Sequence, residues 1–569
     1  MNKEYLRWLE NVQDEAVRAE LESIRGDEAA IEDRFYSELH FGTGGLRGVI
    51  GAGSNRMNVY TVGRATRGYA RYLTEHFDHP SVAIGHDNRK NSDLFAVEAA
   101  CIMAAAGVRV HMYRELMPTP MLSYAVRQLH CQGGIVITAS HNPAIYNGYK
   151  AYGPDGCQMT DDAAHAVEAC IDEMDYFTGE KADFDACLRD GRIAYISDEL
   201  VERFLKEVSA LAPGSKDEAA ALKIVYTPLN GTGRMPVTRV LAMNGFSDVT
   251  VVPQQEMPDP TFATCPYPNP EIRQALELGL QLMTEKKADL LLATDPDCDR
   301  VGTAVWDGGA QRLITGNEMG VLLLDYICEK RTTEGTMPKT PVAIKTIVTT
   351  DMARRVADRY GVEMRDVLTG FKYIGEQIGL LEAEGRPESY LMGFEESYGY
   401  LTGTHARDKD GVNAALIICR MCAHYKAQGM TLADALRKCE EKYGAYRNAL
   451  ENHALPGQDG MKKMEAMMTA LRNDPPKMVM HLPLTRVQDF ETHEDRMMAT
   501  GEVRPITLPT SNVLKFYYGE RITVVVRPSG TEPKLKIYHA VRGDTPLHAD
   551  ELLRGWQEAF ARITDELKK

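Results

Sequence analysis

A serine that directly follows an apolar run is the strongest chemical signal in this chain. Residues 134–137 are Gly-Ile-Val-Ile, and Ser140 lies in the turn Thr-Ala-Ser-His-Asn-Pro that comes next. The run is typical of a buried parallel strand, and ligands of open α/β sheets bind at the carboxyl ends of such strands. We therefore predict that Ser140 is a nucleophile or a phosphate carrier. The alternative is that it only caps a helix.

Two polar side chains lie close to Ser140 in the sequence. His141 follows it directly, and Lys150 ends the segment Asn-Gly-Tyr-Lys. A serine hydroxyl is a weak nucleophile unless a neighbouring base or charge activates it. Both residues are therefore candidates for that role.

Three aspartates alternate along a second loop, which follows the strand-like residues 289–293. The loop reads Asp-Pro-Asp-Cys-Asp-Arg and contains Asp295, Asp297, Asp299 and Arg300. Carboxylates at this spacing repel one another unless a cation lies between them, and oxygen-only ligands suit Mg²⁺. An EF-hand is excluded, because the sixth position is not glycine and the twelfth is not glutamate. Arg300 can offer a fork to a phosphate. The alternative is a solvated acidic turn.

A third loop carries groups that suit sugar hydroxyls. Residues 393–399 are Gly-Phe-Glu-Glu-Ser-Tyr-Gly, which places Glu395 and Ser397 after another apolar run. Carboxylates accept hydrogen bonds and hydroxyls both accept and donate them. Further along, Asp410 is a candidate helix cap, which leaves Lys409 free to face a ligand. A plain polar turn is the alternative.

A fourth loop has the composition of a phosphate cradle. Residues 527–534 are Arg-Pro-Ser-Gly-Thr-Glu-Pro-Lys. An arginine, two hydroxyls and a backbone N–H exposed by glycine together bind phosphate well. The residues concerned are Arg527, Ser529, Gly530 and Thr531. A tight hairpin is the alternative and is compatible with binding.

Alternating strands and helices must position these loops. We expect strands at residues 82–85, 108–112, 134–137, 223–226, 249–252, 289–293 and 342–347. We expect one helix at 92–106, with Ser92 as its cap, a second that ends at Met243, and a third at 351–360. Such alternation predicts several parallel α/β domains with right-handed crossovers. Strands at 522–526 and 535–538 around a turn, followed by a helix at 547–564, predict a smaller α+β domain with antiparallel pairing.

Composition limits the class of protein. The chain has 569 residues, enough for roughly three to five domains. Its net charge of −16 argues against nucleic acid and anionic membranes as partners. We expect no membrane span and no targeting segment. Eleven scattered cysteines favour the reducing cytoplasm, and Cys419 and Cys422 are expected to be core residues rather than a redox pair.

The four loops, in this order, resemble those of the α-D-phosphohexomutase superfamily, and within it the phosphoglucomutase branch. Further matching segments are residues 41–48, 55–58, 85–89 and 369–375. The resemblance covers nearly the whole chain. It implies four domains around a central cleft: three similar mixed α/β domains at 1–212 (phosphoserine), 213–315 (metal) and 316–455 (sugar), and a smaller C-terminal α+β domain at 456–569 (phosphate).

The resemblance also implies the reaction. Ser140 would be carried as phosphoserine, and Mg²⁺ would be bound by Asp295, Asp297, Asp299 and a phosphate oxygen on Ser140. Phosphate would move between C1 and C6 of glucose phosphate through glucose 1,6-bisphosphate, which is also the expected activator. Phosphomannomutase and phosphopentomutase are the alternatives within the class, and a metal-dependent sugar phosphatase or a non-catalytic binder are the alternatives outside it. The expected partners are small sugar phosphates, and the expected form is a monomer or small homo-oligomer.

By matching position, the resemblance assigns the remaining site residues. His141, Lys150 and Arg47 would join Ser140 in catalysis. Several family members have a histidine after the sugar-loop serine where this chain has Tyr398 and Gly399, so the general base is open between Lys150, Lys409 and His141. A lysine desolvated among cations would have a lowered pKa. Sugar or phosphate contacts are implied for Arg47, Arg300, Thr369, Gly370, Lys372, Glu395, Ser397 and Lys409, and distal-phosphate contacts for Arg527, Ser529, Gly530 and Thr531.

Overall fold

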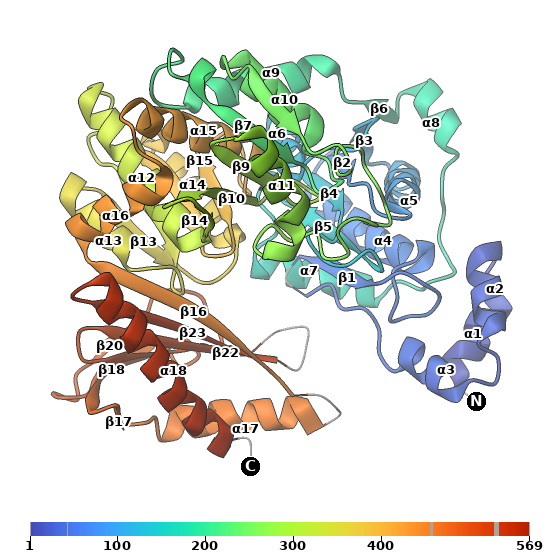
Figure 1. Cartoon of the computed structure of the whole chain (residues 1–569). Helices are drawn as coiled ribbons and strands as arrows, with labels where there is room; N and C mark the ends of the chain where they lie inside the picture. Colours follow the sequence, from blue (N-terminus) through green and yellow to red (C-terminus); the bar gives the residue numbers. More distant parts are fainter. Residues whose placement is uncertain (1, 43, 456–458, 529–533, 568–569) are drawn as a thin grey trace.

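The computed structural model of the chain describes residues 2–42, 44–455, 459–528 and 534–567. Three α/β units follow one another along the chain, and a C-terminal antiparallel sheet lies beside the third of them (Figure 1). The predicted class, mixed α/β followed by a smaller α+β part, is confirmed.

The first unit is a sheet of order β1-β5-β4-β2-β3-β6. Strands β2, β3, β4 and β6 are parallel, and β5 and β1 extend the sheet with antiparallel pairing. Its strands are β1 (Gly45–Val49), β2 (Ser81–His86), β3 (Arg109–Met112), β4 (Gly133–Ile137), β5 (Tyr146–Tyr152) and β6 (Ile193–Tyr195). Its helices are α4 (Val59–His76), α5 (Ser92–Ala105), α6 (Thr119–Gln128), α7 (Asp161–Asp172), α8 (Phe184–Asp190) and α9 (Asp198–Leu211).

The second unit is a sheet of order β11-β10-β9-β7-β8, in which β7, β8 and β9 are parallel and β10 and β11 are antiparallel. Its strands are β7 (Lys223–Thr227), β8 (Asp248–Val251), β9 (Leu290–Thr294), β10 (Val301–Asp307) and β11 (Ala310–Ile314). Its helices are η1 (Ala219–Ala221), α10 (Arg234–Met243) and α11 (Arg273–Lys286).

The third unit is a sheet of order β13-β12-β14-β15, with only β15 antiparallel. Its strands are β12 (Val342–Thr346), β13 (Glu363–Val367), β14 (Tyr390–Glu395) and β15 (Gly399–Thr402). Its helices are α12 (Gly316–Thr333), α13 (Met352–Tyr360), α14 (Phe371–Ala383), η2 (Pro387–Ser389), α15 (Gly411–Ala427) and α16 (Leu432–Tyr443).

The same motif recurs in all three sheets. A buried parallel strand ends, a polar loop follows, and the next strand returns antiparallel beside it: β4 to β5, β9 to β10, and β14 to β15. Ser140, the three aspartates and Glu395 with Ser397 lie at or next to these three loops. The repeated motif therefore brings one predicted chemical group from each unit to a sheet edge.

The last sheet is antiparallel throughout and runs in the order β16-β23-β22-β21-β18-β19-β20, with β17 pairing β18. Its strands are β16 (Ala445–Ala454), β17 (Met478–Val479), β18 (Leu482–Asp489), β19 (Glu494–Met497), β20 (Val503–Pro505), β21 (Leu514–Tyr518), β22 (Ile522–Pro528) and β23 (Lys534–Gly543). The helices α17 (Asp459–Asn473) and α18 (Pro546–Leu567) accompany it.

Three predictions need correction or comment. Because β16 pairs with β23 along its whole length, residues 445–454 belong to the last sheet, so the predicted boundary at 455/456 lies too late. The predicted boundaries at 212/213 and 315/316 fall between elements and stay predictions. The cap of α5 is Asn91 and not Ser92, because the hydroxyl of Ser92 donates to Asp87.

One continuous apolar core joins the first three units. It contains buried side chains from each, among them Tyr124, Tyr226 and Leu416. Cys419 and Cys422 belong to this core, which confirms that they pack rather than form a redox site. A separate core lies under the last sheet, and another cluster joins that sheet to the third unit. The loops of the first three units are therefore positioned by a shared, close-packed interior.

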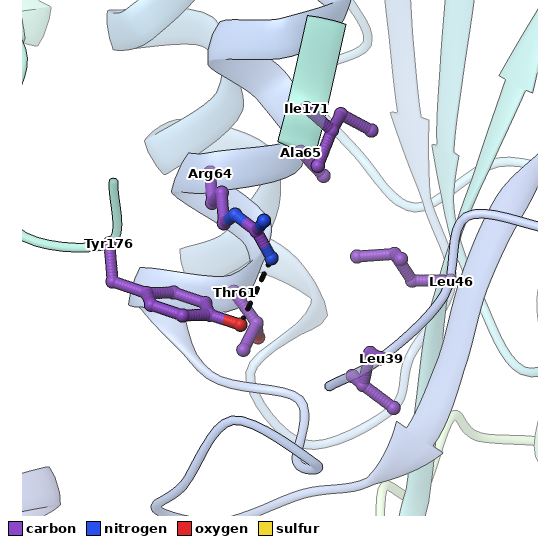
Figure 2. A pocket seen from close by; sticks show the side chains of 7 residues that line it. All are labelled: Leu39, Leu46, Thr61, Arg64, Ala65, Ile171 and Tyr176. Atoms are coloured by element: carbon purple, nitrogen blue, oxygen red, sulfur yellow. Dashed lines mark hydrogen bonds between the residues drawn. The ribbon is translucent and has the colours of Figure 1, made fainter. Parts of the chain in front are cut away.

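The chain begins with three short helices, α1 (Lys3–Asn11), α2 (Glu15–Ser23) and α3 (Glu28–Phe35), at one side of the first unit (Figure 1). Buried Tyr5, Trp8 and Phe35 hold them together, and Trp8 packs against Tyr176 of the first unit. Figure 2 shows the hydroxyl of Tyr176 accepting a hydrogen bond from Arg64 of α4, 3.1 Å away. In the part of the chain that the structure describes, no helix is long and apolar enough to cross a membrane.

Candidate active site

Ser140 lies in a strained turn at the carboxyl end of β4. Its φ is +51°, in the left-handed region that a non-glycine residue seldom adopts, and its side chain is buried. The hydroxyl of Thr138 accepts a hydrogen bond from the Ser140 N–H at 2.9 Å. The Oγ of Ser140 donates to Asp295 Oδ2 at 2.8 Å. The predicted nucleophile therefore contacts the predicted metal loop directly, and it does not cap a helix.

Arg89, to which the sequence pattern assigned no role, stabilises the serine turn through hydrogen bonds. Its guanidinium donates to four carbonyl oxygens of the turn, including those of Ser140 (2.5 Å) and Pro143 (2.9 Å). Asp87 accepts from the Arg89 N–H and pairs with its Nε at 3.2 Å. The signal in the sequence was an arginine three residues after the end of β2, close to the sheet edge that carries Ser140. A buried arginine with this many acceptors stabilises the strained conformation of the turn.

The three aspartates come together in a buried cluster between β9 and β10. Their ligand atoms lie within 4.8 Å of one another. Asp295 Oδ1 accepts the backbone N–H groups of Asp299 (3.0 Å) and Arg300 (2.9 Å), so the loop folds around this carboxylate.

Cationic side chains from two other units approach the cluster. Lys150 Nζ, on β5, lies 3.0 Å from Asp297 Oδ2 and 3.5 Å from Asp299 Oδ2. Lys409 Nζ lies 3.2 Å from Asp299 Oδ2. Within the described residues, however, Asp297 Oδ1 and Asp299 Oδ1 have no hydrogen-bond partner although both are buried. Buried, unpartnered carboxylate oxygens are costly, and a divalent cation would satisfy them, so the residues present fit a metal ion.

The electrostatics of the cluster agree with this fit. Burial, followed by the charges of Asp297 and Asp299, raises the pKa of Asp295 well above its usual range. Asp297 is buried too, but Lys150 keeps the pKa of its carboxyl low. The protein's own groups therefore compensate the negative charge of Asp295 poorly, and a bound cation would compensate it.

The same contacts determine the charge of the two lysines in this structure. Burial lowers the pKa of Lys150, but Asp297 and Asp299 more than compensate and raise it. Lys409 is buried as well, and Asp299 and Asp408 raise its pKa above the usual value. Each lysine also has a neighbouring cation that lowers its pKa, Lys409 for Lys150 and Arg300 for Lys409, but the carboxylates outweigh it. Both act as cations in the structure.

His141 differs from the lysines. Burial, followed by the positive charges of Arg300 and Arg47, lowers its pKa well below the usual value. Its Nδ1 lies 3.2 Å from Ser140 Oγ. At neutral pH, His141 is therefore an uncharged ring in hydrogen-bond contact with the serine.

The sugar loop meets the metal loop through the backbone. Gly399 forms an isolated antiparallel bridge with Arg300, and the N–H of Val301 donates to the carbonyl of Tyr398 at 3.0 Å. Lys409 Nζ also lies 5.5 Å from the ring centroid of Phe371, which follows Gly370. The second and third units are thus joined at the loops predicted to bind metal and sugar.

Glu396, between Glu395 and Ser397, has a titration that can be measured. Burial, followed by the charge of Glu395, raises the pKa of Glu396 to about 7. Because the folded-state pKa is the higher one, its contribution to stability is complete below about pH 4.3 and is lost as pH rises through 7. The free energy of unfolding of the wild type should therefore fall relative to that of Glu396→Gln as the pH rises from 5 to 8, by roughly 2–3 kcal/mol. Thermal unfolding at both pH values measures this, and a difference independent of pH would contradict it.

Other predicted site residues have protein partners. Lys372 Nζ donates to Asp161 of the first unit at 2.6 Å, and the hydroxyl of Tyr373 donates to the same carboxylate at 3.0 Å. The structure therefore places Lys372 in a contact between units. Gly370 has φ +125°, and no hydrogen-bond partner of Thr369 Oγ1 lies within the described part of the chain.

Two predicted arginines lie near the cluster. Arg47, on β1, is exposed, and its Nη1 donates to Asn142 of the serine turn at 3.3 Å. Arg300 Nη1 donates to Glu271 at 2.5 Å. Gly302 allows this contact, because a Cβ there would lie 2.4 Å from the carbonyl oxygen of Pro270. Glu271 was not predicted, and nothing in its sequence context singled it out.

The predicted phosphate loop is only partly described. Ser529, Gly530 and Thr531 lie outside the described residues. Arg527 is at the end of β22, where the strand register places it opposite Lys536 of β23. Burial and the charge of Arg527 lower the pKa of Lys536. Two cationic side chains are therefore adjacent at the start of this loop.

Two hollows in the protein lie elsewhere. One, beside α4, has a volume of about 10 Å³, which is room for about one water molecule (Figure 2). The other, of about 610 Å³, is lined by Ser81 and Arg109 at the amino ends of β2 and β3. That end of the sheet is opposite to Ser140, so neither hollow contains the residues described above.

Three family models match consecutive parts of the chain. They are described as phosphoglucomutase/phosphomannomutase, alpha/beta/alpha domain I, domain II and domain III, and they match residues 38–177, 201–308 and 315–443. These ranges contain the serine turn, the aspartate cluster and the sugar loop, respectively.

Curated relatives match almost the full length. The chain is 35% identical over 514 residues to a phosphoglucomutase of Staphylococcus haemolyticus, covering 90% of this chain and 92% of the relative. It is 34% identical over 546 residues to one from Staphylococcus aureus, covering 95% and 96%.

Solved structures share the fold. A phosphoglucomutase/phosphomannomutase family protein from Burkholderia thailandensis has a TM-score of 0.65 at 17% identity, covering 93% of this chain and 97% of that one. The open form of pp63/parafusin, a phosphoglucomutase from Paramecium, has a TM-score of 0.66 at 15% identity, covering 92% and 95%. At these identities the likeness concerns the fold alone.

Proposed function

Because the chain belongs to the phosphoglucomutase/phosphomannomutase family, we propose that it is a phosphoglucomutase that moves phosphate between C1 and C6 of glucose. The observation that most directly supports this function is the 2.8 Å hydrogen bond from Ser140 Oγ to Asp295 Oδ2. It brings a hydroxyl of one unit to a buried carboxylate cluster of the next. A phosphoryl group on that hydroxyl would lie beside a cation.

Asp295, Asp297 and Asp299 would hold Mg²⁺, the hard cation that an all-oxygen donor set suits. When bound, the ion would neutralise charge on the transferring phosphoryl group. Lys150 and Lys409 contribute fixed positive charge at the same place. We propose that Arg47 and Arg300, which lie near the aspartate cluster, contact the phosphate and the sugar of the substrate.

The reaction proceeds in two transfers. A sugar hydroxyl attacks the phosphorus of phosphorylated Ser140; the new O–P bond forms as the Oγ–P bond breaks. The hydroxyl loses a proton and Ser140 Oγ gains one. We assign a part in that exchange to His141, and its Nδ1, 3.2 Å from Oγ, supports this. The glucose 1,6-bisphosphate formed turns over and returns its other phosphate to Ser140. Added glucose 1,6-bisphosphate would therefore activate dephosphorylated enzyme.

The sugar is held by the third unit and the distal phosphate by the last. We assign the sugar hydroxyls to Glu395 and Ser397, with Thr369 and Gly370 beside them. The distal phosphate is assigned to Arg527, Ser529, Gly530 and Thr531. Lys372, which pairs with Asp161, would contribute by keeping the third unit against the first. The domain divisions near 212, 315 and 444 and a central cleft complete the proposal.

Arg527→Ala should raise the KM for glucose 1-phosphate about 10- to 100-fold with a smaller change in kcat, because it removes a charged hydrogen bond to phosphate. Steady-state kinetics measure this. Arg504→Ala is the matched control, since Arg504 is an exposed arginine of the same sheet that pairs with Glu502. A wild-type KM in Arg527→Ala would remove this residue from the phosphate site.

One assay tests the function. The enzyme is given glucose 1-phosphate, mannose 1-phosphate or ribose 1-phosphate, each with and without glucose 1,6-bisphosphate, and both the isomerised phosphate and free phosphate are measured. We expect glucose 6-phosphate as the main product, stimulation by the bisphosphate and little free phosphate. Preference for mannose or ribose would favour the phosphomannomutase or phosphopentomutase alternative. Stoichiometric free phosphate would indicate a phosphatase.

We also propose a cytoplasmic location and small sugar phosphates as partners, rather than nucleic acid or membranes, for a monomer or small homo-oligomer. The net charge of −16 and eleven cysteines without a disulfide support the first two points.

A further inference from the structure

Thr119 connects the serine-bearing unit to the aspartate cluster. It is the first residue of α6 and is completely buried. Its N–H donates to the carbonyl oxygen of Asp297 at 2.9 Å, and its Oγ1 donates to Asp297 Oδ2, also at 2.9 Å. One residue of the first unit thus fixes both the main chain and the side chain of an aspartate of the second.

The hydroxyl of Thr119 is not needed by its own helix. The cap position of α6 is Pro118, and no side chain caps this helix by a hydrogen bond. Pro118 and Pro120 flank Thr119 and restrict the backbone on both sides. Thr119 therefore presents its hydroxyl to Asp297 from a rigid position.

The two oxygens of Asp297 are used differently. Oδ2 accepts from Thr119 Oγ1 and lies 3.0 Å from Lys150 Nζ. Oδ1 is buried and has no hydrogen-bond partner in the ranges that the structure describes. Because Thr119 Oγ1 and Lys150 Nζ both donate to Oδ2, they fix the orientation of the carboxylate, and Oδ1 stays available to bind a cation.

The neighbouring aspartate shows the same division. Asp299 Oδ2 lies 3.2 Å from Lys409 Nζ, while the buried Oδ1 of Asp299 again has no hydrogen-bond partner among the described residues. In each carboxylate, protein donors lie within hydrogen-bond distance of Oδ2, whereas Oδ1 has no hydrogen-bond partner in the described ranges; Arg300 Nε approaches Asp299 Oδ1 only to 3.8 Å. This is the arrangement by which supporting hydrogen bonds orient metal ligands.

We propose that Thr119 is a positioning residue for the metal site: by holding Asp297 through Oδ2, it keeps Oδ1 directed to the cation. The inference rests on the metal site of the proposed function. It adds that the metal loop is aligned by the first unit, so the unit that carries Ser140 also sets the position of the ion's ligand.

The test is direct binding of Mn²⁺, as the probe cation, to purified full-length protein, measured by electron paramagnetic resonance and calorimetry. Thr119→Val removes the hydroxyl at nearly constant volume and should weaken Mn²⁺ binding about 10- to 100-fold, the usual effect of losing a hydrogen bond to a ligand. Thr119→Ser restores the hydroxyl and should bind within about threefold of the wild type, because the donor is retained.

Thr303→Val is the matched control. Thr303, on β10 of the second unit, is also a buried threonine, and its Oγ1 has no hydrogen-bond partner within the described residues. This variant should bind Mn²⁺ like the wild type. Melting curves without metal check that each variant is folded, and Thr119→Ala takes the same measurement if Thr119→Val does not fold.

Equal Mn²⁺ affinity in folded Thr119→Val and wild type would overturn the inference and leave the proposed metal site standing. Equal losses in Thr119→Ser and Thr119→Val would also overturn it, because the hydroxyl would then be irrelevant. Wild-type protein that binds no Mn²⁺ would overturn the metal site itself, and the inference with it.

Discussion

Ser140→Ala will lower turnover of glucose 1-phosphate by about 10⁴-fold or more, the scale expected when a covalent nucleophile is removed. The alanine variant has no oxygen to accept a phosphoryl group, so general positive charge from Lys150 and Lys409 cannot replace it. Binding of glucose 1-phosphate should change by less than about tenfold, because the binding groups assigned to the other units remain. Coupled kinetics and calorimetric binding measure the two quantities.

Ser54→Ala is the control for this experiment. Ser54 is a buried serine of the first unit that donates to the carbonyl of Ser37 at 2.9 Å, far in sequence from the turn. It should retain wild-type turnover. Substantial turnover in a folded Ser140→Ala protein would remove the serine from the reaction.

Asp297→Asn should have the second largest effect. It replaces a buried carboxylate whose Oδ1 has no hydrogen-bond partner among the described residues, and the amide carries no charge to offset a cation. We expect kcat/KM to fall roughly 10²- to 10³-fold, because a catalytic cation contributes several kcal/mol. Half-maximal activation should also need more Mg²⁺.

Stabilisation by Mg²⁺ provides a readout of Asp297→Asn that does not depend on turnover. A ligand that binds only the folded protein raises its melting temperature, and weaker binding reduces that rise. Asp307→Asn should respond to Mg²⁺ like the wild type, because Asp307 ends β10 of the second unit, where it is half-buried and pairs with Arg437 of α16. An unchanged Mg²⁺ response in Asp297→Asn would exclude this residue from the metal site.

Local patterns predicted the strands that carry the site. The apolar run before Ser140 is β4 and the run before Asp295 is β9. Both are buried, and each is parallel to one neighbouring strand, β2 or β7, and antiparallel to the other. Such strands can be recognised from the sequence because a strand covered on both faces must be apolar throughout. The alternation of aspartates likewise predicted a cluster before its geometry was known.

Contacts between units could not be predicted in this way. Thr119, Arg89 and Glu271 act on residues far away in the sequence. Arg89 lies in the matching segment 85–89, but no local pattern indicates its partners. Thr119 and Glu271 are not distinguished from residues of an ordinary helix start or loop. The raised pKa of Lys150 likewise depends on Asp297 and Asp299 of another unit, which no local pattern reveals. Strand β16 was assigned to the wrong sheet because its partner, β23, lies some eighty residues later.

Single-turnover transfer of a labelled phosphoryl group tests the central claim most directly. Enzyme phosphorylated with radioactive phosphate is isolated, the label is mapped by peptide sequencing, and unlabelled glucose 1-phosphate is added. We expect the label on Ser140 and its transfer, within one turnover, into glucose 1,6-bisphosphate. Active enzyme that never carries the label on Ser140, or label that leaves only as free phosphate, would contradict the mechanism.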